Sequence, residues 1–144
     1  MTKPLIPSLP CMCASLRRAS RLLTQLYEEA LRPSGLRATQ FTVLQALSLA
    51  GEVTQGELGQ ILAMDSTTLT RTLTIMGRRG WIAKRRGKDR REWRMRLSSG
   101  GEAQFKHALP AWQKAQTQLR RRLGDGLSGD LMKLTQKIAN ALVD

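Results

Sequence analysis

The sequence predicts a mainly α-helical fold with one small β-hairpin, and three observations support this. Hydrophobic residues make up 41% of the 144 residues and aromatic residues only 4%, a composition that favours helices over a β-sandwich. Apolar residues recur at helical spacing along most of the chain. One segment near residues 81–97 changes to the alternation typical of a strand. The length suits a single domain, 1–144, with a modest core.

The first part of the chain predicts an extended arm followed by two helices. Three prolines exclude regular structure from residues 1–10. A helix is expected over about 11–31 because its apolar residues share one face, and the sequence RPSG at 32–35 ends it. A second helix is expected over about 38–49, and Gly51 ends it.

Two short helices with a tight connection follow. The sequence TQGE, which begins at Thr54, is a capping box and predicts a helix over about 54–62. A further helix capped by Asp65 or Ser66 is expected to run to about residue 79. Its buried stripe consists of Leu69, Leu73 and Met76. Two short helices joined by about three residues form the helix-turn-helix pattern.

The next segment predicts a strongly basic hairpin. One strand begins at Trp81, and apolar residues alternate with arginines over 93–97, which is typical of a half-buried strand. The sequence RRGKDRR, residues 85–91, supplies the turn. Ten lysines and arginines lie within 78–96 against two acids. This segment is therefore either a solvated loop or a surface for a negatively charged partner.

The last third predicts two more helices. A long helix restarts at the sequence SSGGE, residues 98–102, and Pro110 is expected to kink or break it. The sequence GDGLSGD, residues 124–130, is expected to form a loop before a terminal amphipathic helix.

Composition limits the classes of function. The net charge of +13 favours polyanionic partners, with nucleic acid ahead of an anionic membrane. No apolar run could span a bilayer and the start does not read as a signal peptide, so we expect a cytoplasmic protein with reduced cysteines. His107, the single histidine, has no partner at metal-ligand spacing, and no catalytic constellation stands out. We expect no enzyme, no metal and no cofactor.

The outer face of the 65–79 helix suits a DNA major groove. Short hydroxyl side chains allow close approach, and Arg71 can bind guanine through two hydrogen bonds. The expected DNA-contacting residues of the helix-turn-helix are Thr54, Ser66, Thr67, Thr70, Arg71 and Thr74. Taken alone, such a face is equally well read as a solvated surface.

The basic hairpin favours the DNA-binding interpretation. A helix-turn-helix followed by an arginine-rich ribbon is a winged helix, whose wing reaches along the DNA backbone toward the minor groove. The expected contacts of the wing are Arg86, Lys88, Arg90 and Arg91. Asp89 is expected to hold a neighbouring arginine in one rotamer, so that this arginine loses less entropy on entering a narrow groove.

The sequence DSTTLTRTLTIMGRRGWIAKRRGKDRREWRMRLSSGG, residues 65–101, resembles the MarR family of bacterial transcriptional regulators. The family has a recognition helix of the form (S)xxTxxxxxLxxxG, a wing with DxR, and a strand ending in LTxxG. The matching residues here are Ser66, Thr70, Gly80, Asp89, Arg91, Leu97 and Gly101. Ser98 stands where the family usually has threonine.

The resemblance implies a homodimer. The helices over 11–31 and 102–143 would interlock between subunits, and the winged helix-turn-helix part, 38–98, of each subunit would read half of a pseudo-palindromic operator on double-stranded DNA. The long apolar stripes of the first and last helices agree with this. The resemblance also implies a small-molecule inducer or an oxidant as the signal, and we expect a repressor.

Cys11 and Cys13 are candidate sensor residues. They lie at a helix N-terminus near Arg17 and Arg18, which favours the reactive thiolate. Residues two apart on a helix point away from each other, so cross-subunit pairing, sulfenic acid formation or soft-metal binding are better options than a local bridge. The alternative is two buried, inert thiols.

Two other classes of function compete with the regulator. A structural protein could use the same charge to coat nucleic acid without reading its sequence. A membrane-associated module is disfavoured because the positive charge lies on a hairpin and not opposite an apolar helix face.

Overall fold

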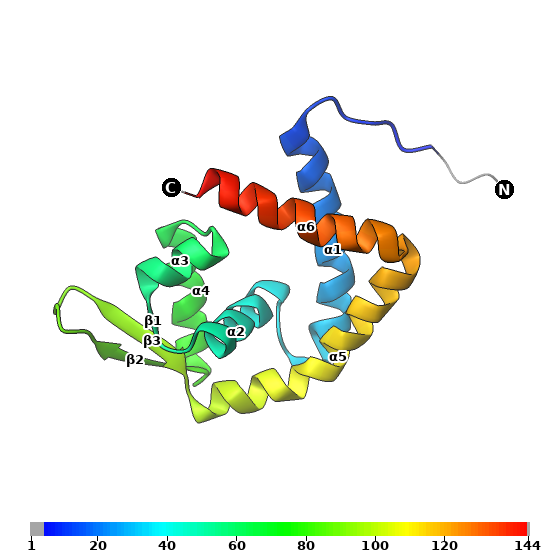
Figure 1. Cartoon of the computed structure of the whole chain (residues 1–144). Coiled ribbons are helices and arrows are strands. Elements are labelled where there is room, and N and C mark those ends of the chain that lie inside the picture. The colour runs from blue at the N-terminus through cyan, green and yellow to red at the C-terminus, as the bar shows by residue number, and fades with distance from the viewer. Residues whose placement is uncertain (1–4, 144) are drawn as a thin grey trace.

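The computed structural model describes residues 5–143 and confirms a mainly helical fold with a small sheet (Figure 1). The elements are α1 (Met12–Leu31), the 3-10 turn η1 (Arg32–Ser34), α2 (Ala38–Ala50), β1 (Val53–Thr54), α3 (Gln55–Leu62), α4 (Ser66–Arg78), β2 (Ile82–Arg86), β3 (Trp93–Leu97), α5 (Ser99–Leu123) and α6 (Asp125–Leu142). In Figure 1 the sheet lies at one end of the molecule, and α1, α6 and the end of α5 lie at the other.

The core lies between α2, the two short helices and the central strand. Its largest fully buried side chains are Leu31, Val43, Leu44, Leu58, Leu69, Leu73, Met76 and Met95. The predicted buried stripe of α4 is therefore confirmed. Phe41 of α2 packs on Phe105 and Trp112 of α5, with ring centroids 5.4 and 5.7 Å apart. These aromatic contacts attach α2 of the winged helix-turn-helix part to α5, the long helix that follows the sheet.

Side-chain caps determine where the two short helices begin. Thr54 Oγ1 accepts a hydrogen bond from the Glu57 backbone N–H at 3.1 Å, which is the first half of the predicted capping box. Asp65, the first of the two caps considered for α4, accepts from the Thr68 N–H at 2.8 Å. That hydrogen bond lowers the pKa of the Asp65 carboxyl.

The sheet has the order β1-β3-β2, with both pairs antiparallel. β1 is a two-residue strand that the sequence pattern does not predict, because so short a segment shows no alternation. In the hairpin, Arg85 lies opposite Arg94 and Arg86 lies opposite Trp93. The sheet therefore has three strands, and the hairpin extends beyond the short β1.

The start of α5 packs directly against the backbone before β2. The Ser98 N–H donates to the Trp81 carbonyl at 3.1 Å, and Ser98 Oγ donates to the Gly80 carbonyl at 2.5 Å. A Cβ atom on Gly101 would lie 2.0 Å from the Trp81 carbonyl oxygen. The SSGG sequence thus combines a serine cap with a glycine that the close approach requires.

The structure decides two expectations for the C-terminal third. Of the two outcomes expected at Pro110, the break does not occur, since α5 runs through this residue as one helix, and the change of direction of α5 along its length in Figure 1 agrees with a kink. The sequence GDGLSGD is not a loop, since α6 begins at Asp125 and Gly124 alone separates it from α5. Gly124, with φ of 84°, ends α5, and the acidic Asp125 suits the first turn of α6.

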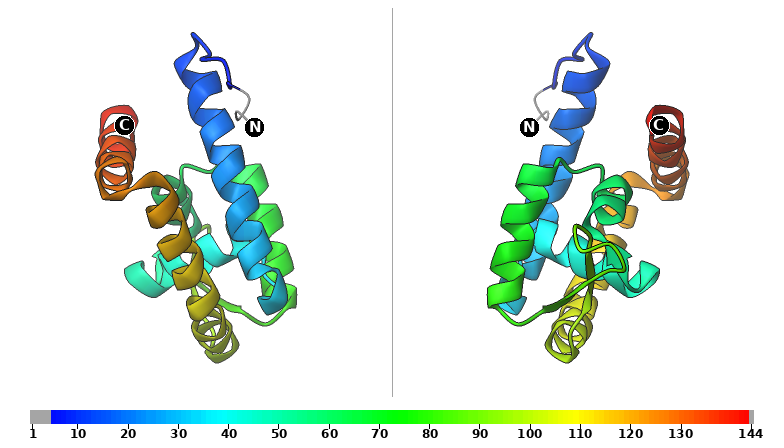
Figure 2. Two further views of the ribbon diagram at one scale, coloured as in Figure 1. Left: turned by 90° about the vertical axis from the view of Figure 1, so that its right-hand side faces the viewer. Right: turned by 90° about the vertical axis from the view of Figure 1, so that its left-hand side faces the viewer.

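α6 and the first half of α1 project from the rest of the molecule in both views of Figure 2. No residue of α6, all of which the structure describes, is buried. Both helices expose large apolar side chains: Met12, Leu16, Leu22, Leu127, Met132, Leu134 and Leu142. Within residues 5–143, none of the helices combines the length and apolarity that crossing a membrane requires.

Candidate nucleic-acid interface

The exposed face of α4 carries the residues that the sequence predicted for the major groove. Leu69, Leu73 and Met76 attach the opposite face to the core. The predicted residues Ser66, Thr67, Thr70, Arg71 and Thr74 are all exposed. The interface residues of this helix therefore lie together, on the side that solvent reaches.

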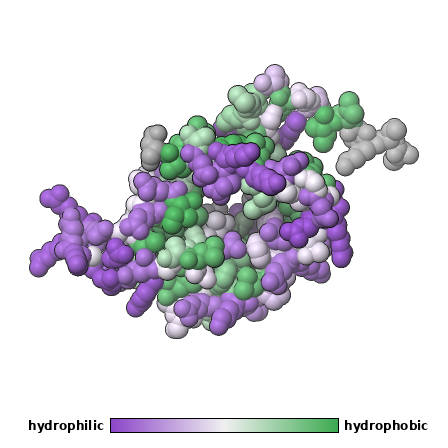
Figure 3. Space-filling model, in the orientation of Figure 1, coloured by the Kyte–Doolittle hydropathy of each residue, from purple (hydrophilic) through white to green (hydrophobic). Residues whose placement is uncertain are grey.

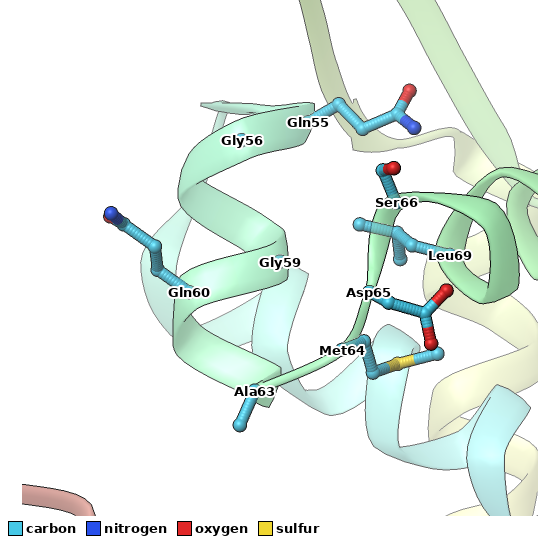
Figure 4. A pocket seen from close by; sticks show the side chains of 9 residues that line it. All are labelled: Gln55, Gly56, Gly59, Gln60, Ala63, Met64, Asp65, Ser66 and Leu69. Atoms are coloured by element: carbon cyan, nitrogen blue, oxygen red, sulfur yellow. The ribbon is translucent and has the colours of Figure 1, made fainter. Parts of the chain in front are cut away.

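A contact between the two short helices was missed by the sequence analysis. Gln55, the first residue of α3, donates a hydrogen bond from Nε2 to Thr70 Oγ1 of α4 at 2.8 Å. Figure 4 shows the hollow between these helices, with Gln55 reaching toward the start of α4. The three connecting residues include Ala63 at a φ of 51°. Gln55 thus fixes a hydroxyl of the exposed face, and no local pattern could have paired it with Thr70.

Thr54 is the exception among the predicted DNA-contacting residues. Its side chain is buried, its hydroxyl caps α3, and its backbone pairs with Arg94 of β3. The capping role predicted for Thr54 leaves no free side chain for DNA. We therefore omit it from the proposed interface.

The wing carries an exposed cluster of cations. Arg86, Lys88, Arg90 and Arg91 are all exposed, and Figure 3 shows the protruding wing as almost entirely hydrophilic. The Arg86 guanidinium lies 4.0 Å from the centroid of the half-exposed Trp93 ring and donates to the Arg90 carbonyl. Stacking on the ring restricts Arg86 to one side of the hairpin. Trp93 is therefore a support for the wing at its outer end and not part of the core.

Asp89 orients the backbone of the wing turn and not an arginine side chain. Its Oδ1 accepts a hydrogen bond from the Arg91 backbone N–H at 3.0 Å, and its carbonyl accepts from the Glu92 N–H at 2.9 Å. Among residues 5–143, the ion pairs do not include Asp89. The expected rotamer restraint is wrong, because an aspartate two residues before a free N–H closes a local turn instead.

Glu52 has the arginine-holding role that the sequence analysis assigned to Asp89. Its carboxylate accepts from Arg85 Nε at 2.7 Å and Nη2 at 2.6 Å, and from Arg94 Nε at 3.3 Å. The hydrogen bonds from Arg85 hold the pKa of the Glu52 carboxyl below its usual value. Because 33 and 42 residues separate Glu52 from these arginines, no motif spacing signals the cluster.

The two cysteines lie exposed at the start of α1. Cys11 Sγ accepts from the Ala14 N–H at 3.4 Å, and Arg17 Nη2 donates to Cys13 Sγ at 3.4 Å. The alternative of two buried thiols is therefore wrong for this chain. No cluster of three or more histidine, cysteine or acidic residues that could hold a metal ion occurs within the described part of the chain.

An apolar cleft of about 460 Å³ separates the winged helix from the projecting helices. Its walls come from α1, α2, α5 and α6, and include Phe41 and Trp112. Tyr27 of α1 lines this cleft, and its hydroxyl donates a hydrogen bond to Gln116 Oε1 of α5. Burial raises the pKa of the Tyr27 hydroxyl. The cleft therefore lies where the projecting helices α1 and α6 meet α2 and α5.

The comparisons with known proteins agree with this geometry. The model of the protein family described as "MarR family" matches residues 34–92 of this chain. The transcriptional regulator MosR of M. tuberculosis, solved in complex with DNA, is 36% identical over 92% of this chain and 98% of its own, with a TM-score of 0.78. The chain belongs to the MarR family. Family membership makes it a transcriptional regulator and not an enzyme.

Two further relatives support the assignment to the MarR family. The Bacillus subtilis protein YwoH, an uncharacterized HTH-type transcriptional regulator, is 32% identical over 62% of this chain and 66% of its own length. A variant of MarR from E. coli, solved with operator DNA, is 26% identical over 88% of this chain and 92% of its own, with a TM-score of 0.79. The chain spans just under two thirds of YwoH and about half of MarR in the curated alignments.

Proposed function

We propose that this MarR-family chain is a dimeric, sequence-specific DNA-binding repressor that acts in the cytoplasm. The main support for the proposal is that two surfaces of the chain face the same way: the hydroxyl-rich face of α4 and the cationic wing. In the right-hand view of Figure 2, α4 and the wing both face the viewer. One surface can therefore reach a major groove with α4 and the neighbouring backbone with the wing. The DNA-bound structures of MosR and MarR support this arrangement.

The dimer is proposed from the projecting helices. The exposed apolar residues of α1 and α6 leave two long stripes that a second copy would cover. We propose that 11–31 and 102–143 dimerise and that 38–98 binds DNA, within one domain over 1–144. Two copies related by a twofold axis would then meet two inverted half-sites.

Selection of bound duplexes from a random pool tests the proposal. A dimeric regulator enriches a pseudo-palindrome with two inverted half-sites one helical turn apart. Footprinting at limiting protein would then protect only that site. Uniform protection and an unenriched pool would instead support the nucleic-acid-coating protein. Enrichment of single half-sites would contradict the dimer.

Replacing Arg91 by alanine is expected to weaken binding to every duplex, because a phosphate contact carries no sequence information. The slope of log affinity against log salt should become shallower by about 0.9, the contribution of one phosphate. Salt titrations with the selected operator and a scrambled duplex measure both effects. Arg32→Ala removes the same charge from an exposed position in η1, outside the proposed dimerisation and DNA-binding segments, and serves as the control. Equal slopes for both variants would remove Arg91 from the interface.

Two kinds of signal are proposed to release the repressor from DNA. A small apolar inducer could occupy the cleft next to Trp112, between the projecting helices and the winged helix. Alternatively, a hydroperoxide could oxidise Cys11 or Cys13 to a sulfenic acid, with the peroxide reduced to an alcohol. The exposure of both thiols and the guanidinium of Arg17 beside Cys13 support the second signal.

Operator titration in the presence of hydroperoxide tests the cysteine signal. Wild-type protein is expected to lose affinity after oxidation and to regain it on reduction, whereas Cys11→Ser/Cys13→Ser protein should bind equally before and after treatment. Parallel titrations with arsenite or zinc test soft-metal binding at the same thiols. Coincident curves for the two proteins under all conditions would exclude the cysteines as the sensor.

A further inference from the structure

The carboxylate of Glu52 connects both strands of the wing to the turn after α2. Glu52 lies between Gly51, which ends α2, and the short strand β1. It holds Arg85 of β2 through two hydrogen bonds, of 2.7 and 2.6 Å, and Arg94 of β3 through one of 3.3 Å. A paired contact of this kind between a guanidinium and a carboxylate is strong and directional. Glu52 therefore determines where two arginines of the wing point.

The hairpin register explains why an acid is needed there. Arg85 and Arg94 lie directly opposite each other across the two strands. Like charges in such a pair repel and destabilise the sheet. The Glu52 carboxylate bonds to both guanidinium groups and offsets one of their two positive charges. Glu52 and Arg94 are also the less exposed members of the cluster, at 25% and 28% of the side chain, so solvent screens this pair less than it does Arg85.

The cluster divides the arginines of the wing into two groups. Arg86, Lys88, Arg90 and Arg91 have no carboxylate partner within the described residues and can neutralise phosphates. Arg85 and Arg94 direct their guanidinium groups to Glu52, and Arg94 Nη1 also lies 4.0 Å from Glu92 Oε1. Binding that ignores sequence grows with the number of phosphates a protein neutralises, since each contact releases counterions. An arginine held by an acid adds little to that number.

We propose that Glu52 is a positioning residue that determines specificity, because it withholds Arg85 and Arg94 from the DNA backbone and holds the wing on the turn after α2. This inference rests on the proposed DNA binding. Without Glu52, Arg85 would have no carboxylate partner among the described residues and Arg94 would keep only its 4.0 Å contact with Glu92. Arg85, and Arg94 where a phosphate displaces Glu92, would then bind phosphates on any sequence, so binding to unrelated DNA would increase relative to binding to the operator.

Salt titrations of Glu52→Gln with the selected operator and a scrambled duplex test the inference. We expect affinity for the scrambled duplex to rise about fivefold, with a salt slope steeper by about 0.9 to 1.8, the contribution of one or two phosphates. The ratio of operator to scrambled affinity is expected to fall by a similar factor. A merely structural role would instead weaken binding to both duplexes and leave the slope unchanged or shallower, which would overturn the proposal.

Two further variants separate the restraint from simple charge. Glu57→Gln makes the same charge change on α3 at a carboxylate without an arginine partner among residues 5–143, and its slope should stay at the wild-type value. The double variant Glu52→Gln/Arg85→Gln should return toward the wild-type slope. An equal rise in Glu57→Gln, or an unreduced rise in the double variant, would contradict the proposal.

Arg85→Gln alone gives a test that does not depend on the folding of the Glu52 variant. If Arg85 is withheld from DNA, its removal leaves the salt slope on scrambled DNA unchanged, in contrast to Arg91→Ala. A slope shallower by about 0.9 would show that Arg85 already binds phosphate, and the inference would be wrong. Failure of the wild-type protein to bind any duplex is a different result, since it would refute the proposed function itself.

Discussion

Replacing Gly101, in the first turn of α5, by alanine is expected to destabilise the protein more than the same change at any other of its glycines. The added Cβ would lie 2.0 Å from the Trp81 carbonyl oxygen and 3.3 Å from Leu97 Cδ2. The carbonyl belongs to the backbone and accepts the Ser98 N–H, so it cannot move without breaking that hydrogen bond. We expect a loss of about 3 kcal/mol or more in the free energy of unfolding, because the start of α5 must separate from the sheet.

Thermal and urea unfolding of the two proteins measure this effect. For a chain of this length, 3 kcal/mol corresponds to a fall of about 6–12 °C in Tm. Gly77→Ala, in α4, is the matched control, since a Cβ there meets no atom within 4 Å. It should be neutral or stabilise the helix by about 0.5–1 kcal/mol. A Gly101→Ala protein as stable as wild type would mean that α5 does not pack on Trp81 as described.

Arg71→Ala is expected to relax the sequence preference of α4 at one base position. The Arg71 side chain is exposed in the middle of the α4 face, where it can donate two hydrogen bonds to a guanine. Removing them should cost about 1–3 kcal/mol against the preferred base and little against the other three. Competition binding with operators substituted at each position measures the loss base by base.

Arg71→Lys is the control for charge in that experiment. A lysine keeps the positive charge but cannot reproduce the planar pair of donors. It should therefore retain most of the affinity for scrambled DNA while losing the base preference. A uniform loss of affinity for all substituted operators would assign Arg71 to a phosphate and would place base recognition elsewhere on α4.

The parts of the fold that follow from nearby residues could be predicted from the sequence. Helix caps act within three residues, as with Thr54 and Glu57, and the buried stripe of α4 repeats within one helix. The hairpin strands show their alternation directly. The GDGLSGD segment misled the prediction because glycine and serine favour turns locally, whereas here Gly124 alone turns the chain and the remaining residues continue as helix.

The candidate interface could likewise be predicted only where its residues lie close together in the sequence. The hydroxyl and arginine face of α4 could be predicted, because residues three and four apart on a helix share a face. The supports of that interface could not. Gln55 meets Thr70 across 15 residues, and Glu52 meets Arg94 across 42. Asp89 illustrates the error that results: the nearest acid in the sequence was assigned to the arginines, while the acid that reaches them comes from another turn.

Because Gly124 alone separates α5 from α6, α6 can act as a lever that pivots at this residue. α6 has 18 residues and is therefore a lever about 27 Å long. Its angle to α5 depends on the two backbone torsions of Gly124, the one residue outside both helices. A rotation of about 10° there would displace the far end of a 27 Å rod by about 5 Å. Small torsional changes at one glycine are thus converted into ångström-scale displacements of the apolar rod that the proposed second subunit would hold.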